Sequence, residues 1–225
     1  MKVFQQQLWH FLILIALLAA VCYCVEMDDT LLRGELWGIS TGTWLVISLL
    51  APILHQIYVL IFWRLELHYK TVTLNLGTHA FRLFKLGFAI LILARPVSII
   101  CLAVSNAWTL DINPVVSYIV SGILFLPAVY LFYSIRRYFG IDRAFGIDHF
   151  EPEKYRNEIM IREGIFKYSG NAMYVYGFLA LWIPGILLQS KAALLLALFN
   201  HLYIWVHFYF TELPDMKIIY GKEND

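Results

Sequence analysis

The sequence predicts an all-α integral membrane protein with about six transmembrane helices. Of its 225 residues, 60% are hydrophobic and 15% are charged, whereas soluble domains have roughly 45–50% apolar and about 25% charged residues. One soluble core cannot bury so many apolar side chains, so lipid must surround the remainder. The net charge of +1 argues against nucleic acid as a partner, because binding to its phosphates needs a dense basic surface.

Six apolar segments have about the length that crosses the hydrocarbon core of a bilayer. They are Leu8–Val25, Trp44–Trp63, Leu83–Val104, Val115–Ile135, Met173–Leu188 and Ala192–Phe210. The first is long for a signal peptide, and Cys22–Val25 offers no small-residue cleavage site, so we expect it to be a helix. We expect residues 1–54 to form an N-terminal transmembrane region and residues 55–225 to form the functional domain.

Basic residues are distributed unevenly between the two sides of this bundle. Fourteen fall on the side of the termini: Lys2, Arg64, Lys70, Arg82, Lys85, Arg136, Arg137, Arg143, Lys154, Arg156, Arg162, Lys167, Lys217 and Lys222. The other side has only Arg33 and Lys191, while Arg95 lies inside a span. Because Lys and Arg are enriched in cytoplasmic loops, we expect both termini in the cytoplasm, with the protein in a bacterial inner membrane or the endoplasmic reticulum. Arg95 is costly in lipid and is expected to find a carboxylate, a carbonyl or water.

The longest polar segment, Arg136–Asn171, is expected to carry the chemistry. About 35 residues between two spans is more than a connection requires, which favours a functional site. Aromatic, glycine and acidic residues alternate in its first part. There Asp148 and His149 can form an acid–base pair, although neighbours on a helix point in different directions. The alternative is a set of solvated polar groups at the membrane surface.

The end of this segment leads directly into the fifth span. Free N–H groups at a helix start can bind a carboxylate, and Asn171 is a natural N-cap. Gly170 permits a positive φ or the close approach of a ligand. The alternative interpretation is a loop, a cap and interfacial tyrosines.

A carboxylate and a proline mark the end of the sixth span. Glu212 falls where the helix leaves the bilayer, and Pro214 opposes simple continuation of the helix. An unpaired carboxylate beside hydrocarbon needs a cation, hydrogen-bond donors or water. His201 and His207 lie on different faces of this span, which argues against shared ligation of haem or a metal, and no metal site is expected.

Together these motifs resemble the membrane phospholipid methyltransferases. The order is Gly164–Tyr168, then Asn171–Tyr174, a short helical hairpin and the exit Glu212–Pro214. The resemblance is to phosphatidylethanolamine N-methyltransferase-like proteins within the wider isoprenylcysteine carboxyl methyltransferase superfamily. It is best over Tyr138–Gly221 and extends weakly to about His55.

The resemblance implies a membrane methyltransferase-like domain with a site at the cytoplasmic interface, S-adenosylmethionine as cofactor and a membrane lipid as acceptor. The implied cofactor-binding residues are Tyr138, Gly164, Tyr168, Asn171, Met173, Tyr174 and Glu212. The helix start at Asn171 suits the carboxylate of the cofactor, Glu212 suits its ammonium or ribose, and aromatic rings suit its sulfonium. We expect the acceptor to be the amine headgroup of a phospholipid, which must first be neutral, so His149 or Asp148 is the expected catalytic base.

Two alternatives stay open. The first is an isoprenylcysteine carboxyl methyltransferase, whose anionic acceptor needs no base but needs a cationic clamp. Arg143, Arg156 and Arg162 can supply that clamp.

The second alternative is a non-catalytic membrane protein that retains the scaffold. Gly170 stands where the family pattern has Arg, Ala172 where it has Pro, and Thr211 where it has the first of two Glu residues. Binding of the cofactor distinguishes this alternative from an enzyme.

Overall fold

The computed structural model describes residues 2–156, 158–159 and 161–221, and within them it is almost entirely helical. Five described helices are long and apolar enough to cross a membrane. They cover Gln7–Met27, Thr41–Tyr69, Thr71–Ser105, Pro114–Phe139 and Lys191–Tyr220. The prediction of an all-α integral membrane protein is therefore confirmed. The predicted fifth span is a shorter apolar helix, Met173–Leu187.

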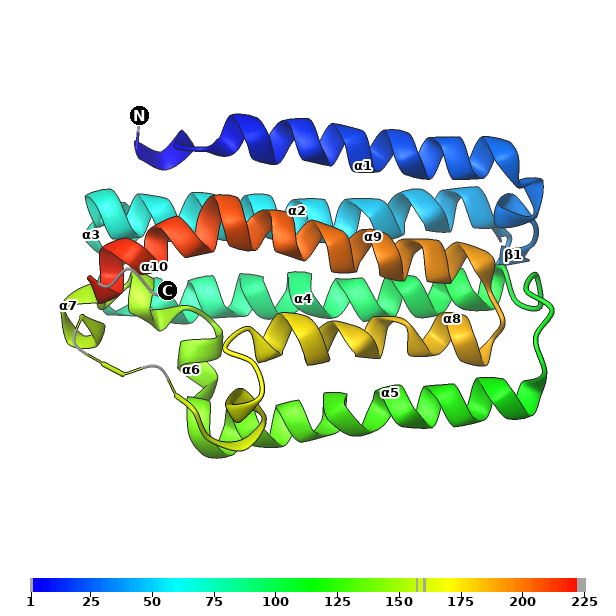
Figure 1. Cartoon of the computed structure of the whole chain (residues 1–225). Helices are drawn as coiled ribbons and strands as arrows, with labels where there is room; N and C mark the ends of the chain where they lie inside the picture. Colours follow the sequence, from blue (N-terminus) through cyan, green and yellow to red (C-terminus); the bar gives the residue numbers. More distant parts are fainter. Residues whose placement is uncertain (1, 157, 160, 222–225) are drawn as a thin grey trace.

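The long helices run side by side, and the described ends of the chain lie at the same end of the bundle (Figure 1). The α-helical parts of the long helices are α1 (Gln7–Met27), α2 (Thr41–Tyr69), α4 (Ala80–Ser105), α5 (Pro114–Ser134) and α9 (Lys191–His207). The shorter apolar helix ends in α8 (Ile183–Leu187). Helix α9 is the central element, because it packs against α1, α2, α4 and α8. Helix α5 packs mainly against α8 and the segments that precede it.

Short elements connect the long helices. They are η1 (Lys2–Phe4), η2 (Asp29–Leu32), β1 (Glu35–Leu36), β2 (Ile39–Ser40), α3 (Thr71–Leu76), η3 (Gly77–His79), η4 (Ile135–Phe139), α6 (Ile141–Ala144), η5 (Ile147–His149), α7 (Pro152–Tyr155), η6 (Gly164–Lys167), η7 (Met173–Gly177), η8 (Phe178–Leu181), η9 (Phe208–Glu212) and α10 (Leu213–Tyr220). Strands β1 and β2 form an antiparallel hairpin. We call the end of the bundle with this hairpin the hairpin end, and the end with α3, α6, α7 and α10 the terminal end (Figure 1).

Several helices begin where the sequence supplies a cap. The side chain of Ser40 accepts a hydrogen bond from the Thr43 N–H at the start of α2. Asn113 caps α5 directly before Pro114, and Ser190 caps α9. These are the residue types that satisfy the free N–H groups of a first helical turn.

A buried asparagine fixes the hairpin end. The Asn106 side chain donates to the carbonyls of Thr30 and Arg33 at 2.8 and 2.9 Å. Its Oδ1 accepts from the Ser190 hydroxyl at 3.1 Å and the Ala192 N–H at 3.0 Å. One side chain thus ties the connection after α1 to the start of the central helix.

Arg95 lies buried inside α4, as its place within a span requires. It donates to the Pro52 carbonyl at 3.4 Å, and its guanidinium lies over the Phe178 ring at 5.6 Å. A carbonyl partner for this residue was one of the expected outcomes.

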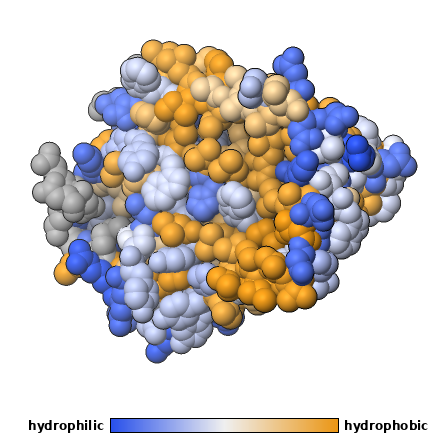
Figure 2. Space-filling view, turned by 45° about the vertical axis from the view of Figure 1, so that its right-hand side comes forward, coloured by the Kyte–Doolittle hydropathy of each residue, from blue (hydrophilic) through white to orange (hydrophobic). Residues whose placement is uncertain are grey.

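Apolar side chains cover much of the outer surface, and Figure 2 shows them as a broad area with hydrophilic residues mainly at its margins. This is the surface that lipid solvates in a membrane protein. The expected division between residues 54 and 55 falls inside α2 and stays a prediction. Lys222 and the last residues of the chain lie outside the described residues.

Candidate functional site

Three helices change their winding at the terminal end. Among the described residues, the π-helical segments are η4, η7 and η9, which lie at the terminal end of α5, before α8 and after α9. Wide turns of this kind re-aim the side chains that follow and are frequent at functional sites. Glu212 is the last residue of one of them, η9.

A buried guanidinium holds this end together. Arg64, at the end of α2, is 1% exposed, and its Nε donates to both carboxylate oxygens of Asp215 at 3.1 and 3.3 Å. Its Nη1 donates to the carbonyls of Val3 at 3.0 Å and Gln5 at 2.7 Å. The N-terminal segment, α2 and α10 are therefore joined by one side chain.

The Arg64 guanidinium also supplies a hydrogen bond that a proline removes from the last helix. Pro214 has no N–H, so the Phe210 carbonyl four residues earlier lacks its usual helical partner. Arg64 Nη2 donates to that carbonyl at 3.0 Å, and Gln7 Nε2 donates to it at 2.8 Å. Pro214 thus removes one backbone hydrogen bond without ending the helix, which continues as α10.

Asp148 and His149 form the pair that the sequence suggested. They lie in the 3-10 turn η5, where the Asp148 Oδ1 contacts His149 Nδ1 at 2.9 Å. The other oxygen of Asp148 accepts from the Tyr220 hydroxyl at 2.8 Å. The Tyr220 oxygen in turn accepts from Arg143 Nη2 at 3.1 Å. The tight 3-10 turn brings two consecutive side chains together, so they need not share the face of a helix.

Four buried polar atoms around this pair have no hydrogen-bond partner among the residues that the structure describes. They are Trp63 Nε1, His149 Nε2, His207 Nδ1 and Glu212 Oε2. The Trp63 ring stacks on His149 at 4.0 Å between centroids and lies 5.9 Å from His207. Buried polar atoms are nearly always paired, so a cluster of unpaired ones calls for a bound polar group. We call Trp63, Asp148, His149, His207, Glu212 and Asp215 the His149 cluster.

Neighbouring charges set the protonation of the pair. Burial by itself disfavours the charged form of both side chains. Asp148, together with Asp215 and Glu212, outweighs burial and raises the pKa of His149 above its usual value of 6.5. Conversely, His149 outweighs burial at Asp148 and, with help from Tyr220, lowers the pKa of this carboxyl. The structure therefore favours a carboxylate beside an imidazolium.

Other predicted site residues lie at the terminal end of α5. Gly164 is buried with φ +57°, and a Cβ there would lie 2.6 Å from Ser134 Oγ and 2.8 Å from the Tyr138 ring. Only glycine fits this close approach without strain. Met173 packs in the neighbouring apolar cluster around Phe166. Tyr138, Gly164 and Met173 are thus grouped together, apart from the His149 cluster in the fold.

The start of the fifth span differs in part from expectation. Asn171 does not cap η7 with its side chain, because the N-cap position is Ala172 and no side-chain cap hydrogen bond is present there. The Asn171 N–H donates to Ser169 Oγ at 3.2 Å. The φ angle of Gly170 is not positive. Tyr168 points outward with 76% of its surface exposed. Tyr174 does reach the last span, where its ring lies 5.7 Å from that of Phe208.

Arg143 connects the two groups of candidate residues. Its guanidinium lies over the rings of Phe139 at 5.3 Å and Tyr220 at 5.6 Å. Phe139 stacks on Phe166 beside Gly164, whereas Tyr220 binds Asp148. The two groups therefore share one positioning side chain.

Four residues of this region are not recognisable as site residues from the sequence: Trp63, Arg64, His207 and Asp215. Asp215 lies three residues after Glu212, and this one-turn spacing is a signal that could have found it. Trp63 and Arg64 lie in the part of the chain where the family resemblance is weak, and Arg64 and Asp215 are 151 residues apart.

Residues 116–223 match the sequence profile of the phospholipid methyltransferase family. This part of the chain is therefore similar to the phospholipid methyltransferases. This match confirms the resemblance and covers all nine predicted site residues. A stretch of 70 residues is 27% identical to the phosphatidylethanolamine N-methyltransferase of Komagataella phaffii. That stretch is 31% of this chain and 8% of the relative, so the chain spans only a small part of that protein. No solved structure was found to match.

The charge balance at His149 is testable. In Asp148→Asn the nearest negative charge is lost while the shape is kept, so burial should prevail and the His149 pKa should fall below that of the wild type. NMR titration of labelled histidine rings in the detergent-solubilised protein measures this shift. Asp142→Asn is the matched control, because Asp142 is exposed and pairs with Lys85. An unchanged His149 titration in Asp148→Asn would contradict the assigned cause.

Proposed function

We propose that this chain transfers a methyl group from S-adenosylmethionine to the amine headgroup of a membrane phospholipid. The observation that carries the proposal is the set of unpaired buried polar atoms around Trp63, described above. Three of the four come from residues 149, 207 and 212, inside the segment that matches the phospholipid methyltransferase profile. A polar ligand in this place would give each of them a partner.

The side chains present fit the proposed cofactor. Its ammonium and ribose hydroxyls need acceptors, and Glu212 Oε2 is a buried acceptor without a partner. Its carboxylate needs a hydrogen-bond donor, and Trp63 Nε1 is a buried donor with no partner among the described residues. When bound, the cofactor supplies an electrophilic methyl group on a sulfonium, a cation that the ring of Tyr174 can attract.

The Asp148–His149 pair is suited to hold the proton of an amine acceptor. An ammonium headgroup has no free electron pair, so it must lose a proton before its nitrogen can attack a methyl group. Asp148 occupies Nδ1 of His149, which leaves Nε2 as the free basic atom. Only the neutral imidazole accepts a proton, so we expect turnover to rise with pH through the raised pKa of His149.

The arginines favour an amine acceptor over a prenylcysteine carboxylate. Arg143 is engaged by Glu158 at 3.0 Å, and Arg156 is engaged by Glu153 at 2.8 Å. Two members of the three-residue cationic clamp are therefore neutralised by the protein itself. The family profile, which is that of phospholipid methyltransferases, favours the same acceptor class.

We further propose that the terminal end faces the cytoplasm. The fourteen-to-two distribution of basic residues supports this orientation, and a soluble donor then meets a bilayer-bound acceptor at the interface. Reporter fusions before Lys2 and after Asp225 should both appear cytoplasmic, and a reporter at Asp29 should not. A C-terminal reporter on the far side would contradict the number of crossings.

Binding of the cofactor is the sharpest test of the site. Glu212→Gln keeps the shape of the side chain and removes its charge, which should weaken S-adenosylmethionine binding about ten- to hundredfold, as loss of a charge-assisted hydrogen bond implies. Calorimetric titration of wild type and variant measures it. Glu153→Gln serves as the control, since Glu153 is exposed and pairs with Arg156 at the protein surface.

Equal affinities in wild type and Glu212→Gln would remove Glu212 from the site. Absence of binding to the wild type would favour the non-catalytic alternative and refute the proposed reaction.

The acceptor requires a separate experiment. Purified protein is incubated with methyl-labelled S-adenosylmethionine and a total lipid extract, and the labelled lipid is identified by mass spectrometry. We expect the label on an amine headgroup, and its loss in His149→Gln with donor affinity largely kept. Label in a carboxyl methyl ester would instead support the prenylcysteine alternative.

A further inference from the structure

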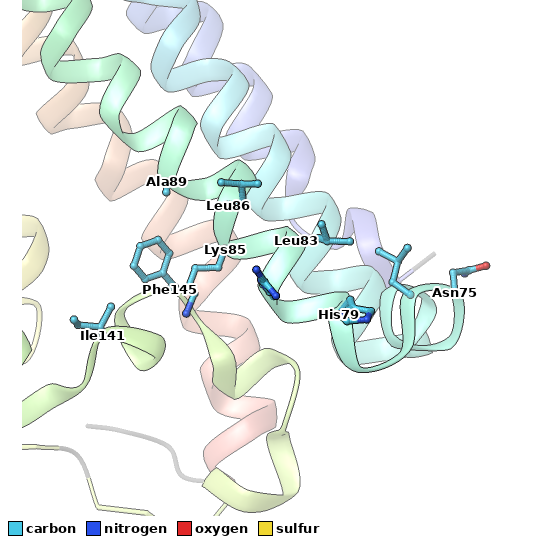
Figure 3. Close-up of a pocket in the computed structure, with 10 residues that line it drawn as sticks. Asn75, His79, Leu83, Lys85, Leu86, Ala89, Ile141 and Phe145 are labelled. Carbon is cyan, nitrogen blue, oxygen red and sulfur yellow. The ribbon is translucent and has the colours of Figure 1, made fainter.

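A groove at the terminal end lies outside the His149 cluster. It has a volume of about 880 Å³ and is formed by α3, η3 and the first turns of α4 on one side and by α6 and Phe145 on the other. Figure 3 shows Lys85 extending from α4 towards the segment that carries Phe145. This volume is within the range of ligand-binding pockets.

Basic side chains line the rim of this groove. They are His79, Arg82 and Lys85. Lys85 pairs with Asp142 at 2.6 Å, whereas Arg82 is exposed and has no carboxylate within 4 Å among the described residues. One permanent positive charge is therefore uncompensated. A guanidinium matches the geometry of a phosphate better than any other side chain, because it can donate two parallel hydrogen bonds.

The remaining wall of the groove is apolar and continues along α4. Leu86, Ala89 and Phe145 lie below the basic rim. Beyond them Ile90 and Leu93 are 62% and 61% exposed on the face of α4 that Leu86 begins. These positions are three or four residues apart, so they form one stripe on the helix. A ligand that fits both features has an anionic group joined to a long apolar chain.

The groove and the His149 cluster lie on two sides of one short segment. Phe145 packs against Phe88 of α4 at 4.9 Å between ring centroids. The next residue, Gly146, lies so close to Trp63 that a Cβ would come within 2.4 Å of its ring. Residues 141–149 therefore separate the groove from the candidate site by little more than the thickness of the chain.

We propose that this groove binds a phospholipid of the surrounding bilayer, with the phosphate at Arg82 and an acyl chain along the stripe of α4. The bilayer supplies such a molecule, since Arg82 and the stripe both belong to α4, which is part of the candidate span Thr71–Ser105. Charge complementarity favours a lipid with a phosphate over a neutral one. The assignment does not need methyl transfer, because binding can be measured without any methyl donor.

Competition for a spin-labelled phosphatidylglycerol in detergent micelles tests the proposal on the full chain. Unlabelled phosphatidylglycerol and phosphatidylethanolamine should displace it, and diacylglycerol with the same acyl chains should displace it at least tenfold less well. Arg82→Gln should weaken binding about ten- to hundredfold. Arg82→Lys, which keeps the charge but loses the paired hydrogen bonds, should have an affinity between those of the wild type and Arg82→Gln. Arg136→Gln is the matched control, because Arg136 is an exposed arginine at the same end but outside the groove.

Three results would overturn the assignment: equal binding by wild type and Arg82→Gln, equal competition by diacylglycerol, or displacement of the lipid by millimolar inorganic phosphate alone. The last result would identify a site for free phosphate. Thermal unfolding of each variant shows whether a loss of binding reflects a loss of fold. If Arg82→Gln unfolds, the comparison of diacylglycerol with phospholipid on the wild type decides the question.

Discussion

The terminal end of the bundle depends on the buried guanidinium of Arg64. A buried ion of this kind costs several kcal/mol of desolvation unless its donors and its charge are satisfied. Here every nitrogen has a partner: the Asp215 carboxylate, two carbonyls of the N-terminal segment and two carbonyls of η9. The desolvation cost is offset only when α10, the N-terminal segment and η9 all contact Arg64. The guanidinium therefore couples the positions of these three segments.

The candidate site follows from this coupling. Trp63 precedes Arg64 on α2, and Glu212 precedes Asp215 by one helical turn. When Arg64 binds Asp215, these neighbours are brought to the same place, and the η5 turn closes over them with His149. Pro214 contributes by freeing the Phe210 carbonyl that Arg64 requires. The irregular part of this helix, with the π-helical segment η9 and Pro214, is therefore the part that carries the site residues.

The His149 cluster concentrates three carboxylates beside one imidazole in a buried place. Desolvation disfavours all these charges, yet an opposite charge at hydrogen-bond distance outweighs it for Asp148 and His149. The buried polar atoms that still lack a partner are the ones that can bind a ligand. Because the same segment forms one wall of the basic groove, a soluble molecule and a lipid can approach it from different sides.

The sequence by itself determined the membrane-spanning helices and the family resemblance. Long apolar runs can be solvated only by lipid, and the motif around Asn171 and Glu212 is local enough to read along the chain. Tertiary structure alone decided that Trp63 and His207 join the site and that Asn171 does not cap its helix. Periodicity shows which face of a helix is polar, but it does not show which distant residue faces it. Contacts between residues far apart in the chain arise only when the bundle packs.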